Sequence, residues 1–258
     1  IVGNVLRSIG HPDTEFGGGI GSCVATVTLS DCTIRSNRVV ATAWDQRVYG
    51  GGIGIKEGSW RTRDSVIAFN NANGDMRSLN YGGGLYVDGG AQEFGNLLLH
   101  HNVCNTNGSQ VIAMHEGDGA YVLNTTNVIF RNCTFVDNFE QGLEALTNIV
   151  VNSCILWSNK MDVTGRVTLA YCDIGVPAAT VVTNDCIGVE PLFVDRTYYH
   201  LQSRMAAYEG GYFSGGEWKA SVSNSPLIDM GDPTAPYDRE PQPSGRRVNM
   251  GAYANSHE

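Results

Sequence analysis

One phrase recurs along this chain: three glycines and an apolar residue, followed later by an apolar segment that ends in asparagine. The clearest glycine triplets begin at Gly17, Gly50 and Gly82, which are 33 and 32 residues apart. The asparagines that end the matching segments keep the same two intervals and are Asn37, Asn70 and Asn102. Two features that shift together at one period define a repeated structural unit. This repeat limits the possible folds more than any other property of the chain.

Each repeat contains short alternating segments of Val, Ile, Leu and Thr, broken by Gly, Asn and Asp, and shows no useful helical period. Short strands that recur without intervening helices predict an all-β fold, a parallel β-helix of about six coils. Successive coils would stack at about 4.8 Å, the strand spacing of any sheet. The early repeats exceed the later ones by residues 38–48, 72–80 and 103–116. We interpret these stretches as loops on one side of the coil.

Alignment of the repeats sorts inward from outward positions, because side chains two residues apart on a strand share a face. One predicted inward column contains Cys32, Ser65, Leu97, Cys133, Cys154 and Cys172. A second contains Ile34, Ile67, Leu99, Phe135, Leu156 and Ile174. The residues between them should point outward: Thr33, Val66, Leu98, Thr134, Ile155 and Asp173. The asparagine column is predicted to form an amide ladder at a turn, with no chemical role.

Composition excludes some functions. The formal net charge is −9 and the pI is near 5.1, which argues against nucleic acid as a partner. No apolar run reaches the length that a membrane-spanning helix needs. Residue 1 lies in a strand-like segment rather than a signal peptide, so we expect the sequence to be a mature or trimmed part of a longer protein. The seven cysteines include no C-x-x-C pair, and we expect the inward ones to be reduced, buried thiols.

The repeats resemble the right-handed parallel β-helix repeats of bacterial surface proteins, among them the polymorphic outer-membrane protein repeats. Residues 190–195, 199–201, 225–233 and 247–253 resemble the C-terminal segment of secreted bacterial β-helix proteins of the choice-of-anchor Q group. Glu190 and Met230 depart mildly from that pattern, which has Asp and Ala there. The resemblance implies a right-handed coil and an extracellular or cell-surface location. It does not supply a reaction.

Residues 1–195 are predicted to form the β-helix and residues 196–258 a capping segment packed on the last coil. The second stretch breaks the repeat and is rich in proline and aromatic residues. A solenoid has an open apolar end that invites aggregation unless it is covered. Acidic residues in this stretch offer an alternative Ca²⁺ site: Asp229, Asp232, Asp238 and Glu240. They lack a defined calcium-loop spacing, so we predict no metal and assign them to turns and backbone capping.

The strand after each glycine opening carries the candidate binding surface. Its outward positions on neighbouring coils include Lys56, Tyr86, Asp88, Tyr121 and Glu144. Rings offer a sugar apolar faces and carboxylates accept its hydroxyl protons. We therefore predict that Lys56, Tyr86, Asp88 and Tyr121 bind a polysaccharide or cell-surface glycan. An ordinary solvated sheet face is the alternative interpretation.

Candidate catalytic residues lie where the glycine opening fails. Asp118 replaces a middle glycine and Glu140 breaks the next opening, close to Glu144 and Glu116. Paired carboxylates are what glycoside cleavage needs, so Asp118, Glu140 and Glu144 are the predicted catalytic residues. A lyase or epimerase would instead take its base from a second group of residues and neutralise a uronate with carboxylates or Ca²⁺. Those residues are Lys56, Tyr86, Tyr121, His100, His101 and His115.

Two functions follow from the sequence. The first is an extracellular carbohydrate-binding or polysaccharide-processing protein, lyase-like or hydrolase-like. The second is a non-catalytic surface stalk or adhesin module of a larger secreted protein. Fold alone does not choose between them.

Overall fold

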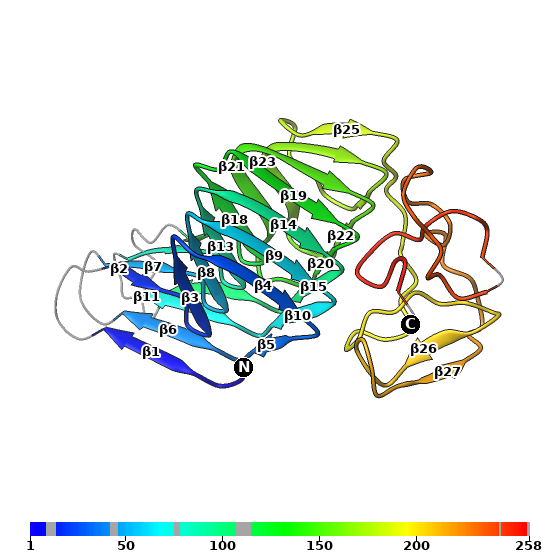
Figure 1. Cartoon of the computed structure of the whole chain (residues 1–258), viewed down its shortest axis with the longest axis horizontal. Helices are drawn as coiled ribbons and strands as arrows, with labels where there is room; N and C mark the ends of the chain where they lie inside the picture. The colour runs from blue at the N-terminus through cyan, green and yellow to red at the C-terminus, as the bar shows by residue number, and fades with distance from the viewer. Residues whose placement is uncertain (9–13, 42–45, 75–77, 107–114, 243, 257–258) are drawn as a thin grey trace.

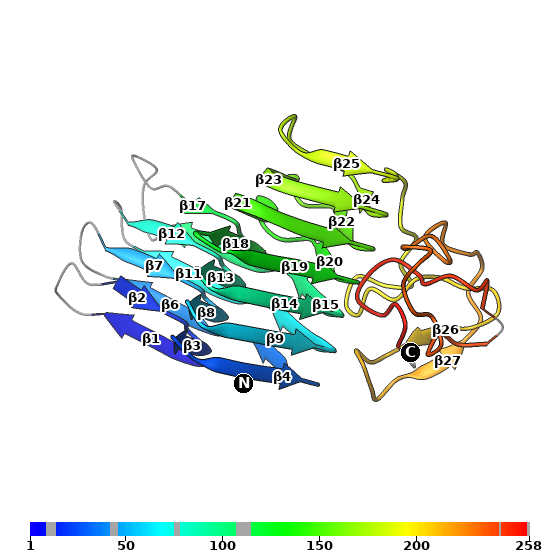
Figure 2. The ribbon, with the colours of Figure 1, turned by 45° about the horizontal axis from the view of Figure 1, so that its top comes forward.

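The strands wind into a solenoid in which neighbours within each sheet come from successive coils (Figures 1 and 2). The structure, a computed structural model, describes residues 1–8, 14–41, 46–74, 78–106, 115–242 and 244–256. Over these residues the strands complete six coils, and every strand pair of the solenoid is parallel. The predicted all-β parallel β-helix is confirmed.

Sheet A contributes one strand per coil throughout the solenoid. Its strands are β24 (Asp173–Ile174), β22 (Ile155–Trp157), β20 (Thr134–Val136), β15 (Leu97–His100), β10 (Ser65–Ala68) and β5 (Thr33–Arg35). The register keeps the predicted columns, since Ile34 pairs with Ile67 and Ile67 with Leu99.

Sheet D turns a corner, and each early coil crosses it with two strands. The first half holds β3 (Ile20–Cys23), β8 (Ile53–Lys56), β13 (Leu85–Asp88) and β18 (Ala120–Leu123). The second half holds β4 (Thr26–Ser30), β9 (Ser59–Arg63), β14 (Ala91–Gly95) and β19 (Asn127–Arg131). Later coils cross both halves in the long strands β21 (Gln141–Asn152) and β23 (Met161–Ala170), followed by β25 (Val182–Asn184).

Two further sheets include most of the described residues of the stretches that we expected to be loops. Residues 42–45, 75–77 and 107–114 of those stretches lie outside the described residues. Sheet B is formed by β1 (Val5–Ser8), β6 (Arg38–Ala41), β11 (Asn71–Gly74) and β16 (Val103–Thr106). Sheet C is formed by β2 (Thr14–Phe16), β7 (Arg47–Tyr49), β12 (Leu79–Tyr81) and β17 (His115–Glu116). The loop interpretation was wrong for these residues, because their backbone groups pair from coil to coil.

The cross-section narrows between the fourth and fifth coils, and we call this place the step. In the described residues, sheets B and C end with β16 and β17. The fifth coil passes from Asn138 to β21 in a few residues, with neither sheet. Phe139 lies on the step and is 65% exposed. The last long coil and the first short coil therefore meet along an uneven edge.

The interior confirms the predicted inward columns. Both columns from the second coil onward are buried, and Ile34 is fully buried in the first. The asparagine ladder also exists: each amide Nδ2 donates to the next Oδ1 at 2.9–3.1 Å, from Asn4 up to Asn159. Asp162 ends the ladder by accepting from Nδ2 and N of Asn159. Cys133, Cys154 and Cys172 are buried free thiols.

The C-terminal segment lies along the outer face of sheet A rather than over the last coil (Figure 2). Val66, Leu98 and Val136 of β10, β15 and β20 pack against its Tyr199 and Ala252. The predicted outward residues Val66, Leu98, Thr134 and Ile155 thus point out of the coil and are buried beneath this segment. Its only regular strands within the described chain are the antiparallel pair β26 (Ala207–Glu209) and β27 (Glu217–Lys219).

The described residues include no helix of the length and apolarity that a membrane crossing requires.

Candidate active site

A double layer of aromatic rings covers the outside of the first half of sheet D. Tyr86 and Tyr121 point outward, as predicted, yet they are only 3% and 4% exposed. Tyr49 stacks on Tyr86 with 4.3 Å between ring centroids, and Tyr81 lies 4.8 Å from Tyr121. The predicted sugar-binding tyrosines are therefore the inner layer, and half-buried Tyr49 and Tyr81 form the outer one.

The outer layer comes from the residue before each glycine triplet. Phe16, Tyr49 and Tyr81 end β2, β7 and β12 and pair in register. In the first two coils the inner column, beneath the outer rings, consists of glycines. The ring of Phe16 lies so close that a Cβ added at Gly54 would be 3.1 Å from its atoms. Sequence reasoning missed this layer, although the column of aromatic residues before the glycines was a readable signal.

Both columns change from rings to carboxylates at the step. Glu116 pairs with Tyr81 and continues the outer column on β17. Glu144 pairs with Tyr121 and continues the inner column on β21. Glu116 forms a side-chain hydrogen bond with Tyr121. Glu116 and Glu144 thus follow the last rings of the two columns, on β17 and β21. Figure 2 shows these strands near β18.

Glu144 has the least satisfied carboxylate of this cluster. Its Oε2 is sealed from solvent and accepts no hydrogen bond within the described chain. Burial, reinforced by the charges of Glu116 and Asp118, raises its pKa to about 7. Burial and the same neighbouring Glu116 also raise the pKa of Tyr121. Glu144 can therefore hold or release a proton near neutral pH, as a general acid or base must.

Asp118 occupies a different environment. It is 1% exposed. Its Oδ1 accepts from the backbone N–H of Cys104 at 2.6 Å, and its Oδ2 accepts from those of Glu140 and Gln141. The short fifth coil lacks sheets B and C, so these N–H groups lose the strand partners that earlier coils supply. Asp118 satisfies them and joins a long coil to a short one.

Glu140 lies on the surface of the step. Its carboxylate pairs with Lys160 of the next coil at 2.8 Å, and both side chains are substantially exposed to solvent. The carboxylate cluster thus consists of Glu144, Glu116 and Tyr121. Asp118 instead binds backbone N–H groups, and Glu140 pairs with Lys160. The catalytic roles of Asp118, Glu140 and Glu144 remain predictions.

Lys56 and Asp88 lie at the far ends of β8 and β13, two residues beyond the inner aromatic column. Together with Glu57 and Asn124 they line a shallow depression at the corner of sheet D. Asp88 accepts from the Asn124 amide at 2.9 Å and from the Tyr86 hydroxyl at 3.4 Å. Their binding role also remains a prediction.

The histidines considered as alternative bases lie on another face. His100 is 1% exposed, and its Nε2 lies 3.3 Å from the Tyr212 hydroxyl of the C-terminal segment. Burial lowers its pKa to about 3, with His101 and Arg35 acting in the same direction. The side chain of His115 lies outside the described residues. His100 and His101 therefore lie at the end of a sheet A strand, whereas Glu116 and Glu144 lie on sheets C and D.

The acidic residues of the C-terminal segment cap backbone groups. Asp232 accepts from Thr234 N, Glu240 from the N–H groups of Asn249 and Asn255, and Asp229 from Gly245 N. Within the described ranges, no three His, Cys, Asp or Glu side chains gather as a metal site would.

Comparison with protein families agrees with the geometry. The model described as "Right handed beta helix region" matches residues 18–188, about two thirds of the 258 residues. The chain belongs to the right-handed β-helix family. The coil therefore has the predicted hand, and the matched region lies within residues 1–195. Searches of curated proteins and of solved structures found no significant match.

Proposed function

We propose that this β-helix protein cleaves a neutral polysaccharide outside the cell by hydrolysis, with Glu144 as the general acid. One observation carries the proposal: Glu144 has a solvent-sealed, unpartnered carboxylate oxygen beside Glu116 and Tyr121, at the end of an aromatic row. Membership in the β-helix family is compatible with polysaccharide processing and with surface modules.

The chemistry assigns different roles to the two carboxylates. Glu144, with a pKa of about 7, would donate its proton to the glycosidic oxygen. Glu116 would be the base or nucleophile of the pair, since glycoside cleavage needs a second, ionised carboxylate. Asp118 would act as a positioning residue, because its buried contacts fix the start of the strand that carries Glu144.

Charge favours hydrolysis of a neutral chain over elimination from a uronate. The charged groups that perturb Glu144 are the carboxylates of Glu116 and Asp118, which would repel a uronate. Lys56, the basic candidate on this sheet, lies at the far end of β8. The half-buried rings of Tyr49 and Tyr81 would guide the sugar chain toward the step.

The test is turnover of a panel of neutral glucans, mannans, xylans and galactans, with polygalacturonate and alginate alongside. Glu144→Gln and Glu116→Gln should each lower kcat by at least about a hundredfold, the typical contribution of a positioned acid or base. Glu93→Gln is the matched control, because Glu93 is a carboxylate of sheet D paired with Arg61 on the surface. It should leave turnover unchanged.

Three outcomes would overturn the proposal. Cleavage of uronate polymers alone would favour a lyase, and full activity in Glu144→Gln would remove Glu144 from the mechanism. Glycan binding without turnover of any polymer would favour the surface stalk or adhesin module.

A further inference from the structure

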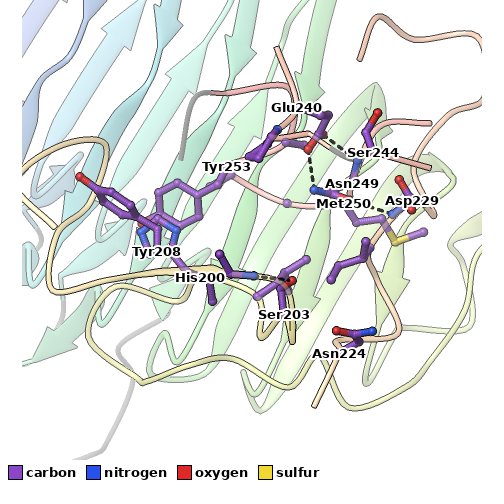
Figure 3. Close-up of a pocket in the computed structure, with 18 of the residues that line it drawn as sticks. His200, Ser203, Tyr208, Asn224, Asp229, Glu240, Ser244, Asn249, Met250 and Tyr253 are labelled. Carbon is purple, nitrogen blue, oxygen red and sulfur yellow. Dashed lines mark hydrogen bonds between the residues drawn. The ribbon is translucent and has the colours of Figure 1, made fainter. Parts of the chain in front are cut away.

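A second candidate site lies on the opposite side of the molecule, between sheet A and the C-terminal segment. Here a cavity of about 530 Å³ opens between the outer face of the coil and the segment that covers it (Figure 3). Thr134 and Ile155 of β20 and β22 and Met250 of the segment contribute to its lining. Its volume falls in the range of small-molecule sites, which is about 300–1,000 Å³.

A group of aromatic rings lines one part of the cavity. Trp218 of β27 is 44% exposed and meets Tyr208 of β26 edge-on at 5.5 Å. Tyr208 in turn meets His200, which stacks on Tyr253 with centroids 3.6 Å apart. The Tyr208 hydroxyl accepts from Gly216 N at 2.8 Å, so that ring is held in place. Trp218 therefore offers a partly exposed ring on a rigid support.

Fixed polar groups line another part of the cavity, around Glu240 and Asn249 (Figure 3). Glu240 accepts from Asn249 N and Asn255 N with Oε1 and from Asn249 Nδ2 with Oε2. Both carboxylate oxygens are thus already engaged. Ser203 Oγ accepts from the backbone N–H groups of Met205 and Ala206, which leaves its hydroxyl proton to donate. The lining combines acceptors and donors that are already oriented.

The charge of the residues that line the cavity restricts the charge of the ligand that it can bind. The described residues that line the cavity include Asp229 and Glu240 and no Lys or Arg. Burial lowers the pKa of His200 to about 4, so this ring is neutral at neutral pH. An anionic ligand would meet only carboxylates and neutral groups. A tightly held cation would need free carboxylates, whereas those of Glu240 are occupied by N–H donors.

We propose that this cavity binds a neutral saccharide, with Trp218 as its stacking platform. Sugar hydroxyls both donate and accept hydrogen bonds and match a lining of that mixed character, and sugar rings match an aromatic face. The site is remote from Glu144, so it would hold a glycan independently of any cleavage at the step.

The experiment is calorimetric titration of the full chain carrying Glu144→Gln, which keeps a bound sugar from being cleaved. The probes are cello-, laminari-, manno- and xylotetraose, with tetragalacturonate and tetramethylammonium as anionic and cationic competitors. At least one neutral tetraose should bind. Trp218→Ala should weaken that binding by about tenfold or more, as truncation of a central aromatic anchor does. Val222→Ala, at an 89% exposed position outside the lining, should not change it.

A second variant keeps the proposal testable if Trp218→Ala does not fold. Ala206→Trp would fill the cavity from its half-exposed lining position without removing a ring, and it should abolish binding while circular dichroism stays unchanged. Binding of only the galacturonate or the ammonium ion, no binding of any neutral tetraose, or unchanged binding in both variants would overturn the proposal. In a separate assay with Glu144 intact, turnover that persists in Trp218→Ala while tetraose binding is weakened would support separate roles for the step and the cavity.

Discussion

At the scale of single residues, three acidic side chains near the step have different surroundings. Asp118 is buried and accepts three backbone N–H donors, Glu140 pairs with Lys160 in solvent, and the Oε2 of Glu144 is buried with no donor. Environment, not residue type, sets the protonation behaviour of a carboxyl group. Glu144 is therefore the member of the set whose proton is available near pH 7.

The first prediction concerns Glu144 and folding stability. Its pKa is about 7 in the folded chain against 4.5 as the ordinary value, so between these pH values the folded state holds a proton that the unfolded state has lost. The free energy of unfolding that Glu144 contributes should then fall as pH rises from 4.5 to 7. In urea denaturation, the free energy of unfolding of the wild type minus that of Glu144→Gln should decrease as pH rises across this window, because Gln cannot ionise. Thr164→Val, at the paired position on β23, should differ from wild type by a constant amount; a constant difference for Glu144→Gln too would contradict the prediction.

The second prediction concerns Asp118. In Asp118→Asn, one carboxylate oxygen becomes an NH₂ group that must face a backbone N–H donor. We expect a loss of about 1–3 kcal/mol in the free energy of unfolding, the cost of unsatisfied buried groups. Glu140→Gln should leave the urea midpoint almost unchanged, because the ion pair it removes is exposed. Equal midpoints for the two variants would show that Asp118 does not hold the step together.

Sequence reasoning reached some of these residues and missed others for a physical reason. It located Glu144 and the outward tyrosines from period two alone. It missed that Tyr49 and Tyr81 cover the tyrosines, because alternation distinguishes the two faces of a strand and says nothing of a second layer. The role of Asp118 depends on which N–H groups lose partners where the coil shortens, and a one-dimensional pattern does not contain that information.

At the scale of elements, the outer face of sheet A behaves as a second core. Val66, Leu98 and Ile155 point out of the coil and are at most 1% exposed. Their apolar character was a sequence signal that this face is covered. The order of strands could be predicted from the repeat, whereas the position of the covering segment could not, because residues 196–258 share no period with the coils.

The third prediction concerns this covered face. Leu98→Ala should cost about 2–5 kcal/mol in the free energy of unfolding, as for other buried leucines, and should speed proteolytic cleavage within residues 196–258. Leu99→Ala is the matched control, since Leu99 is the next residue and points into the coil. It should lower stability with less effect on cleavage of the segment. Equal rates of segment cleavage in both variants would mean that Leu98 does not anchor it.

At the scale of the whole molecule, two buried histidines connect to the covering segment. His100 of β15 lies beside Tyr199 and Tyr212. His200 donates from Nε2 to the backbone carbonyls of Gly211 and Tyr212 within the segment itself. Around His100 lie also His101, Arg35 and Asp137. Burial lowers the pKa of His100 to about 3 and of His200 to about 4. Both rings are therefore neutral in the folded protein at neutral pH.

The fourth prediction follows from these histidines. Their pKa in the unfolded chain is near 6.5. Below that pH the unfolded state therefore binds protons that the folded state does not bind. Stability should then fall as pH drops from 6.5 toward 4, first where the segment meets sheet A. Hydrogen exchange, corrected for intrinsic rates, should show loss of protection in residues 196–258 at pH 4.5 and less in the coil. His100→Phe should reduce this response, and uniform loss along the chain would contradict it.

The step also has a consequence for how such proteins diverge. The aromatic row gains at least one ring with every long coil, about 4.8 Å at a time, whereas Glu116 and Glu144 belong to the place where coil length changes. Duplication or deletion of one long repeat before β16 would alter the span of the row and leave the carboxylates in register. The length of glycan that the molecule accommodates and the reaction at its end can therefore be inherited separately.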